Sequence, residues 1–212
     1  MKGVLPEVGV ELELFLMRGD KIVEPASFGF PADEMGFLVE LRSWPSENVC
    51  DITSSLEELY SFADKKAKKL GMELVLAPTM AFDESFVEYL WAKYQYDQMP
   101  DHTRNIYAAD GPRESHHVGL FGNKATSGLH VHFSLREIGA RGLTARVLPL
   151  QYREITKAMD GAFEREIREA GRLAGEYELK THGFEYRSLP CTVSVEDAAS
   201  AALSILDRFK DK

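Results

Sequence analysis

The sequence predicts an α+β fold in which helices pack on one face of an antiparallel or mixed sheet. Several segments alternate strictly between apolar and polar residues, as in VGVELELFL and SGLHVHFS, which is typical of strands with one buried face. Other segments repeat apolar residues every three or four positions, which is typical of amphipathic helices. Because the strands alternate rather than forming continuous apolar runs, one face of the sheet is expected to stay open.

The first half of the chain predicts four strands and two helices. The strands are expected over residues 7–17, 22–24, 36–42 and 72–77, with a turn at 18–21 and a loop at 25–35. Helices are expected over 55–70, between a capping box of Ser55 with Glu58 and a stop at Gly71, and over 84–94. The predicted buried stripes are Leu56, Leu59, Tyr60, Ala63, Ala67 and Leu70 in the first helix and Phe86, Tyr89 and Leu90 in the second.

The second half predicts three more strands and two helices. An irregular polar loop over residues 97–113 precedes strands at 116–121 and 128–135, a long helix at 147–170 and a strand at 183–188. The predicted stripe of the long helix includes Leu148, Tyr152, Ile155, Met159, Ala162, Phe163 and Ile167. A closing helix at 195–209 begins at the caps Ser194 and Asp197 and buries Ala198, Ala201, Ala202, Ile205 and Phe209.

Composition narrows the classes of partner. A chain of 212 residues is expected to form a single domain over 1–212. The formal net charge of −9 makes nucleic acid a poor partner, because phosphate binding needs a basic surface. The sequence contains no apolar run of about 20 residues for a membrane span, and its first residues, MKGVLPEVGVELELF, include acidic residues where a signal peptide is expected to be apolar. Two cysteines predict no disulfide framework, so a cytoplasmic location is expected.

Four strand segments each place two chemistry-capable side chains two residues apart. Residues i and i+2 of a strand point to the same face, about 6.5 to 7 Å apart. The pairs are Glu11 and Glu13, Glu40 and Arg42, His130 and His132, and Glu185 and Arg187. The opposite faces of these strands are apolar, with Leu12, Phe37, Val39, Leu41, Val131 and Phe184 among them. The three pairs that contain glutamate are each common surface patterns, and the histidine pair is a stronger signal for a divalent ion or a phosphate oxygen. Four such pairs on one sheet face together predict a metal and phosphate site.

The inventory of the pairs suits phosphoryl transfer. Carboxylates bind Mg²⁺, imidazoles bind divalent ions or phosphate oxygens, and guanidinium groups stabilise a transferring phosphoryl group. The sequence has no GxxxxGK[ST] motif and no strand-linked GxGxxG motif, so any ATP would be held without a P-loop or a Rossmann turn.

Four segments follow one another along the chain in the order GVELELF, LVELRSWP, SGLHVHFS and FEYRSLP. This ordered set resembles the motif series of ATP-dependent carboxylate–amine ligases with the glutamine synthetase or glutamate–cysteine ligase type of catalytic sheet. The short amidoligase branch is the most similar, and the motifs extend over residues 9–190. The resemblance implies a curved antiparallel half-barrel that holds ATP and Mg²⁺, or Mn²⁺, on its polar face. It also implies that a carboxylate substrate forms an acyl phosphate, which a substrate amine converts to an amide or peptide-like bond.

The resemblance also implies a role for each matching residue. The metal ligands would be Glu11, Glu13, Glu40, His130 and Glu185. The residues at the transferred phosphate and the substrates would be Arg187, Glu40 and Arg42, with His132 and Arg187 at the nucleotide. Glutamine synthetases carry a further metal glutamate after the second strand, and only Glu47 is near that position. The carboxylate and amine substrates and the oligomeric state stay open.

Two alternatives of other classes are also open. His130, His132 and Glu137 form an H-x-H-x₄-E pattern that resembles the first cupin motif, which would bind iron or manganese in a small barrel. However, Glu137 is expected beyond the strand, and a downstream histidine partner is missing. The second alternative is a ligand-binding relative that keeps the sheet and has lost turnover.

Overall fold

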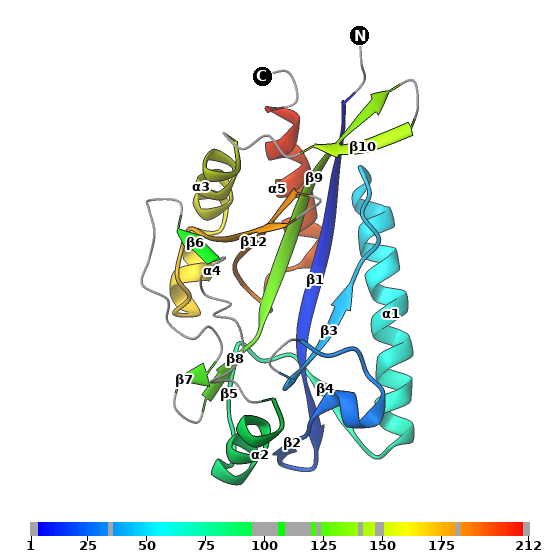
Figure 1. The fold of residues 1–212 in the computed structure, drawn as a ribbon, viewed down its shortest axis with the longest axis vertical. Helices are drawn as coiled ribbons and strands as arrows, with labels where there is room; N and C mark the ends of the chain where they lie inside the picture. The colour runs from blue at the N-terminus through cyan, green and yellow to red at the C-terminus, as the bar shows by residue number, and fades with distance from the viewer. Residues whose placement is uncertain are drawn as a thin grey trace.

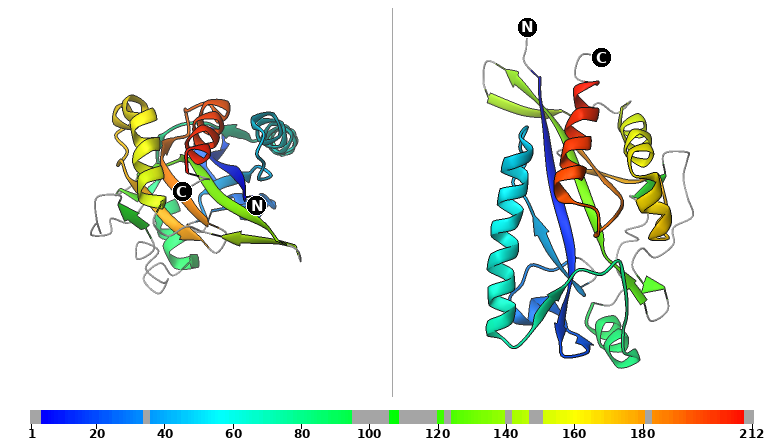
Figure 2. Two further views of the ribbon diagram at one scale, coloured as in Figure 1. Left: turned by 90° about the horizontal axis from the view of Figure 1, so that it is seen from above. Right: turned by 180° about the vertical axis from the view of Figure 1, so that it is seen from behind.

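The computed structural model describes residues 4–33, 36–94, 106–108, 120–121, 124–139, 142–146, 151–180 and 183–209. Its centre is a curled antiparallel sheet in the form of a half-barrel, so the predicted α+β class is confirmed (Figures 1 and 2). The path of neighbouring strands is β2 (Lys21–Ile22), β1 (Val4–Arg18), β9 (Gly128–Gly139), β12 (Gly183–Pro190), β11 (Glu176–Lys180) and β6 (Ile106–Ala108). Strands β3 (Leu38–Arg42) and β4 (Glu73–Val75) also pair with β1, and β10 (Gly142–Arg146) pairs with β9.

The register of the central strands fixes which polar residues are neighbours. Glu11 of β1 lies opposite Arg42 on β3 and opposite His130 on β9. On the other side of β9, His132 lies opposite Glu185 of β12. Paired residues of antiparallel strands share a face, so the polar pairs form one continuous band across four strands.

Four helices cover the opposite face of the sheet, as the two views of Figure 2 show. They are α1 (Val49–Lys69), α3 (Tyr152–Ala162), α4 (Glu164–Glu169) and α5 (Val195–Asp207). The main core lies between them and the sheet and includes Val8, Val10, Leu12, Leu14, Val131, Phe133, Phe184 and Tyr186. Phe133 and Phe184 stack across β9 and β12 with ring centroids 4.8 Å apart. The sheet side of this core consists largely of the apolar strand positions that the alternation predicts.

A second apolar cluster lies on the same side of the sheet as the polar band, at one end. Helix α2 (Glu84–Tyr94) and a small sheet of β5 (Thr79–Ala81), β8 (Lys124–Thr126) and β7 (Leu120–Phe121) close this end. The cluster is Phe15, Met17, Ile22, Phe37, Leu38, Phe82, Leu90 and Ala125. The assignment of Phe37 to the face of Val39 and Leu41 is therefore wrong. Its ring packs edge-on against Phe82 at 5.3 Å, because residue 37 precedes the regular strand.

The first long helix begins six residues earlier than predicted. Asn48 is the N-cap of α1, and its side chain accepts a hydrogen bond from the Cys50 amide. Ser55 instead donates to the Ile52 carbonyl within the helix, so the predicted capping box at Ser55 is wrong. The predicted buried stripe is correct for Leu56, Ala63 and Ala67 but wrong for Leu59, Tyr60 and Leu70, which are exposed.

The helix predicted over 147–170 is two helices. Phe163, with φ −127° and ψ 25°, separates α3 from α4, and its ring is buried. Ala162, which was predicted to be buried, is exposed, and so is Tyr89 of α2. Leu148 and most of the 97–113 loop lie outside the described residues; within that loop, β6 pairs with β11.

Other elements follow the prediction closely. The bounds of α2 match, α5 begins at the predicted Ser194 cap, and the turn at 18–21 contains Gly19 at a φ of 62°. Strand β11 and the small strands β5 and β8 were not predicted, and the predicted strand at 116–121 is described only at β7. No helix in the described ranges combines the length and the apolar character that a membrane span requires.

Candidate metal and phosphate site

The structure brings all eight residues of the four pairs together on the concave face of the half-barrel. Each pair comes from a different strand, and its two members lie on the same face because of strand alternation. In order across the sheet, the pairs are Glu40 and Arg42 on β3, Glu11 and Glu13 on β1, His130 and His132 on β9, and Glu185 and Arg187 on β12. Their side chains form one connected network of ion pairs.

Glu11 is the centre of this network. One carboxylate oxygen, Oε1, lies 3.1 Å from Nδ1 of His130. The other, Oε2, accepts a hydrogen bond from Nε of Arg42 at 2.7 Å and lies 3.2 Å from Nε2 of His132. Arg42 also pairs with Glu40 through Nη2. Glu11 thus joins side chains from both neighbouring strands.

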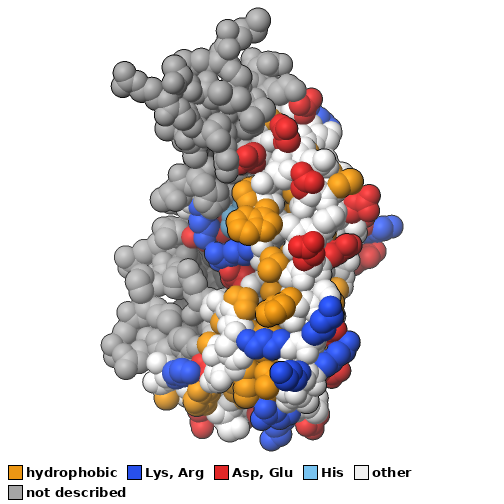
Figure 3. All heavy atoms as spheres, turned by 90° about the vertical axis from the view of Figure 1, so that its right-hand side faces the viewer, with side chains coloured by type: hydrophobic (Ala, Val, Ile, Leu, Met, Phe, Trp, Pro, Cys, Tyr) orange, Lys and Arg blue, Asp and Glu red, His pale blue; other side chains and the backbone are white. Residues whose placement is uncertain are grey.

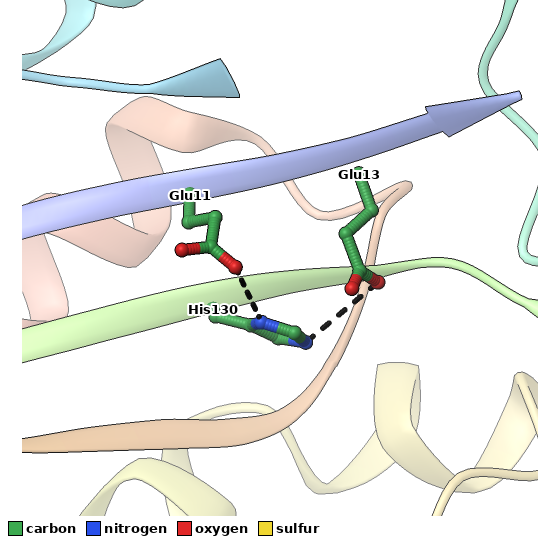
Figure 4. A group of neighbouring side chains, drawn as sticks. All are labelled: Glu11, Glu13 and His130. Carbon is green, nitrogen blue, oxygen red and sulfur yellow. Dashed lines mark hydrogen bonds and ion pairs between the residues drawn. The ribbon is translucent and has the colours of Figure 1, made fainter. Parts of the chain in front are cut away.

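The ring of His130 lies between carboxylates from two other strands. Its Nδ1 is 2.9 Å from Oε1 of Glu185, and its Nε2 is 3.7 Å from Oε2 of Glu13 (Figure 4 shows His130 with Glu11 and Glu13). The same Glu13 oxygen accepts a hydrogen bond from the backbone amide of Gly128 at 2.6 Å. A Cβ atom at position 128 would lie 2.8 Å from Nε2 of His130. The glycine of the SGLHVHFS motif therefore leaves room for the imidazole.

Burial and mutual charge shift the protonation of these groups. Burial and then the charge of Glu11 raise the pKa of Glu40 to about 8. Burial favours the protonated carboxyl of Glu11, but its hydrogen bonds with His130 and His132 hold the pKa well below the usual range. Burial favours neutral His130, but the charge of Glu13 and hydrogen bonds to Glu11 and Glu185 raise its pKa to about 9. The raised pKa thus favours the protonated, positively charged imidazole at neutral pH.

Strand β11 adds two residues that the motif analysis missed. Nζ of Lys180 lies 2.9 Å from both Glu178 and Glu185, and Nη1 of Arg187 lies 3.4 Å from Glu178. Glu178 and Lys180 are themselves an i, i+2 pair in EYELK, so the same signal was present in the sequence. The segment was missed because the strand was not recognised.

Arg172 is a further residue without a sequence signal. Its guanidinium donates hydrogen bonds to the backbone carbonyls of Ser127, Arg187 and Ser188 at 2.7 to 3.2 Å. These carbonyls flank the register shift of β12 against β9 between Tyr186 and Leu189. Such an irregularity leaves backbone groups without ladder partners, and Arg172 satisfies them. It holds in place the strand segment that carries Arg187.

Two sets of three ligand atoms are close enough to hold an ion. The first is Glu11, Glu13 and His130, and the second is Glu11, His132 and Glu185, with the ligand atoms of each set within 4.8 Å of one another. Glu11 is common to both. His132, which the resemblance places at the nucleotide, belongs geometrically to the second set.

Two weaker candidates lie outside these sets. Glu47 is exposed on the segment before α1, as its position in a turn suggested. Glu137 lies within β9 rather than beyond it, so that expectation is wrong, and its side chain is outside the described part of the chain. The site that the structure describes is built by glutamates of other strands and does not depend on Glu137.

Comparisons with protein-family models, with curated proteins and with solved structures found no match for this chain. Its function must therefore be inferred from the site.

Proposed function

We propose that the protein is an ATP-dependent carboxylate–amine ligase that uses Mg²⁺ or Mn²⁺. The observation that carries the proposal is the convergence of metal-ligating and phosphate-binding side chains on the concave face of an antiparallel half-barrel. The ordered sequence motifs that resemble this class of ligase supply these same residues. We also propose a cytoplasmic location, which the two free cysteines support.

The residues fit divalent cations. Five carboxylates, of Glu11, Glu13, Glu40, Glu178 and Glu185, meet three arginine and lysine side chains in the described network. Burial and then the negative charge of Glu11 raise the pKa of Glu40, so a cation bound nearby would favour its ionised form. Carboxylate oxygens are the preferred ligands of Mg²⁺, and an imidazole ligand suits Mn²⁺ as well.

Glu11, Glu13 and His130 would hold one ion, and Glu11 with His132 and Glu185 would hold a second. Bound divalent ions would neutralise phosphate oxygens and orient the triphosphate. A ligand histidine must lose its proton, so the raised pKa of His130 predicts competition between the ion and that proton.

Arg187 is the residue we assign to the transferring phosphoryl group. Its side chain is 18% exposed, and Nη1 pairs with Glu185 and Glu178. Its Nε is buried and has no hydrogen-bond partner among the described residues. An ionised donor of this kind is suited to a phosphate oxygen, whose charge grows during transfer. Arg42, 65% exposed at the other side of the network, would contact a substrate.

The proposed reaction has two steps. A substrate carboxylate oxygen attacks the γ-phosphorus of ATP, ADP leaves, and an acyl phosphate forms. The nitrogen of a substrate amine then attacks the acyl carbon, the C–O bond breaks, phosphate leaves, and the amine loses a proton. The side chains of this chain would act by orienting both substrates and offsetting charge.

The test is phosphate release from Mg-ATP in pools of small-molecule and peptide carboxylates with amines, followed by mass spectrometry of the products. We expect phosphate release that depends on both substrates and a new amide. Glu13→Gln should abolish it, and Glu47→Gln, at an exposed position outside the network, should not. A strong thermal response to Fe²⁺ with none to Mg-ATP would favour the cupin-like reading. Mg-ATP binding without any turnover would favour a ligand-binding relative.

A further inference from the structure

Helix α1 presents an apolar patch on the outer side of the molecule. Its exposed members are Leu59 and Phe62, with Phe62 71% exposed, and Trp44, 76% exposed, lies beside the helix. The backbone amide of Trp44 donates a hydrogen bond to Ser55 at 3.1 Å, which places the residue one turn before Leu59. Single exposed apolar residues are ordinary, but three of them along one stripe form a patch that is typical of an interface.

The charges on α1 are separated along the helix. Asp51, Glu57 and Glu58 lie in the N-terminal half. The C-terminal half contains Lys65, Lys66, Lys68 and Lys69 and one acidic residue, Asp64, which pairs with Lys68, so the two halves still have opposite net charge. Figure 3 shows this face with apolar side chains between a region rich in acidic side chains and a region rich in basic ones. In sequence, Leu59 is the midpoint of the 21-residue helix, and Phe62 is one turn further along.

We propose that this face binds a second copy of the chain, with the two α1 helices antiparallel across a two-fold axis near Phe62. A two-fold interface must be complementary to itself. Glu58, Phe62 and Lys65 are spaced i, i+4 and i+7, so they lie on one side of the helix. Antiparallel packing would place Glu58 of each copy opposite Lys65 of the other, with the two Phe62 rings between them.

Self-complementarity is the reason to choose a second copy over another partner. A nucleic acid or an acidic membrane would attract the lysine half of the helix and repel its acidic half. A partner of one charge would thus fit only half of the face. In contrast, an identical helix in the reverse direction matches both halves at once.

The length of α1 limits the area of the proposed interface and therefore the expected strength of self-association. A helix of this length is roughly 30 Å long, so a face about 15 to 20 Å wide gives an interface at the lower end of the range for specific complexes. We therefore expect a monomer–dimer equilibrium that depends on protein concentration, and not a permanent dimer. Because charge pairs contribute, association should weaken as the salt concentration rises.

The test is sedimentation velocity of the whole chain over a range of concentrations, with charge-reversal variants. We expect Glu58→Lys and Lys65→Glu each to weaken self-association at least tenfold. The two single variants mixed together should form heterodimers, because every contact then joins opposite charges, and the double variant should recover self-association. The thermal unfolding midpoint of each variant serves as a folding control, since both residues are exposed.

Three outcomes would overturn the proposal. One is a wild-type protein that stays monomeric at the highest concentration. The second is single reversals that associate as well as the wild type does. The third is a mixture of the two single variants that shows no heterodimer although each variant is folded. Binding of the monomer to vesicles of acidic phospholipid, abolished by Lys65→Glu, would instead assign the face to a membrane surface.

Discussion

The two halves of one strand face carry opposite chemistry. Glu11, Glu13, Phe15 and Met17 alternate along β1 and point to the same side of the sheet. Glu11 and Glu13 lie among histidines and arginines of the neighbouring strands. Phe15 and Met17 lie in the second apolar cluster, under α2 and the small sheet. Charged side chains of neighbouring strands therefore surround the polar half of this strand face, whereas α2 and the small sheet cover its apolar half.

The difference bears on what each half contributes. Burying the side chain of Phe15 stabilises the fold by roughly 2 to 3 kcal/mol. Burying Glu11 and Glu13 carries a desolvation penalty that ion pairs at best offset, so the polar half adds little to stability. A fold that retains several buried carboxylates beside a well-packed apolar half is best explained by a function of the polar half.

The largest effect is expected from Arg187→Ala. If Arg187 stabilises the charge that develops on the transferred phosphoryl group, the variant should lose amide formation by about a thousandfold or more. It should still fold and bind Mg-ATP, and Arg187→Lys should also be impaired, because the charge remains but the planar fork is lost. The measurements are single-turnover amide formation and nucleotide binding. Full activity in Arg187→Ala would show that Glu185 and Arg187 form an ordinary salt bridge.

Phe15→Ala tests the apolar half. The side chain is fully buried, so its truncation should lower the free energy of unfolding by about 3 to 5 kcal/mol. The affinity of the folded variant for Mg²⁺ should change less than threefold, because Phe15 belongs to the other cluster. Urea unfolding and isothermal titration calorimetry measure the two quantities. A variant with wild-type stability but a large loss of affinity would contradict the division of the strand into two halves.

Glu13→Gln is the matched change two residues away. The amide keeps an oxygen that can accept the hydrogen bond from the Gly128 amide, so the metal-free fold should change by no more than about 1 kcal/mol. The stabilisation by bound metal, about 2.7 kcal/mol at a concentration 100-fold above Kd, should be lost. Thermal unfolding with and without Mg²⁺ or Mn²⁺ measures this difference. An unchanged metal response would exclude Glu13 from the ligands.

The contrast between the halves also marks what the sequence could predict. Strand alternation was enough to place the four polar pairs on one face, because each strand buries its other side in the core. The apolar cluster on the same face was not predicted, because it depends on α2 and the small sheet folding back over Phe15. Tertiary contact between segments far apart in sequence leaves no local pattern.

The wrong start of the first helix and the missed residues at the edge of the site have separate physical causes. Asn48 and Ser55 are both good N-cap residues, and only the path of the chain into α1 selects Asn48. Lys180 and Glu178 had the required spacing, but their strand has only five residues and was not predicted. Arg172 donates hydrogen bonds to backbone carbonyls where the pairing of β12 with β9 is irregular. No spacing of side chains in the sequence predicts such a contact.

The smallest expected effect is the change of metal affinity with pH. The pKa of His130 is raised to about 9, so its ring holds a proton at neutral pH that an ion bound by this ring must displace. The raised pKa of His130 means that its stabilising contribution is fully present below about pH 6.5 and is lost as the pH rises through 9.

Raising the pH from 7 to 8 should therefore make Mn²⁺ binding up to about tenfold tighter, about 1.4 kcal/mol, while the metal-free protein becomes less stable. Titration calorimetry in buffers of different ionisation enthalpy should detect proton release on binding. Glu47→Gln should leave this release unchanged, because Glu47 is exposed outside the network. Affinity that is flat or falls between pH 7 and 8, with no proton released, would show that the ion does not replace the proton of His130.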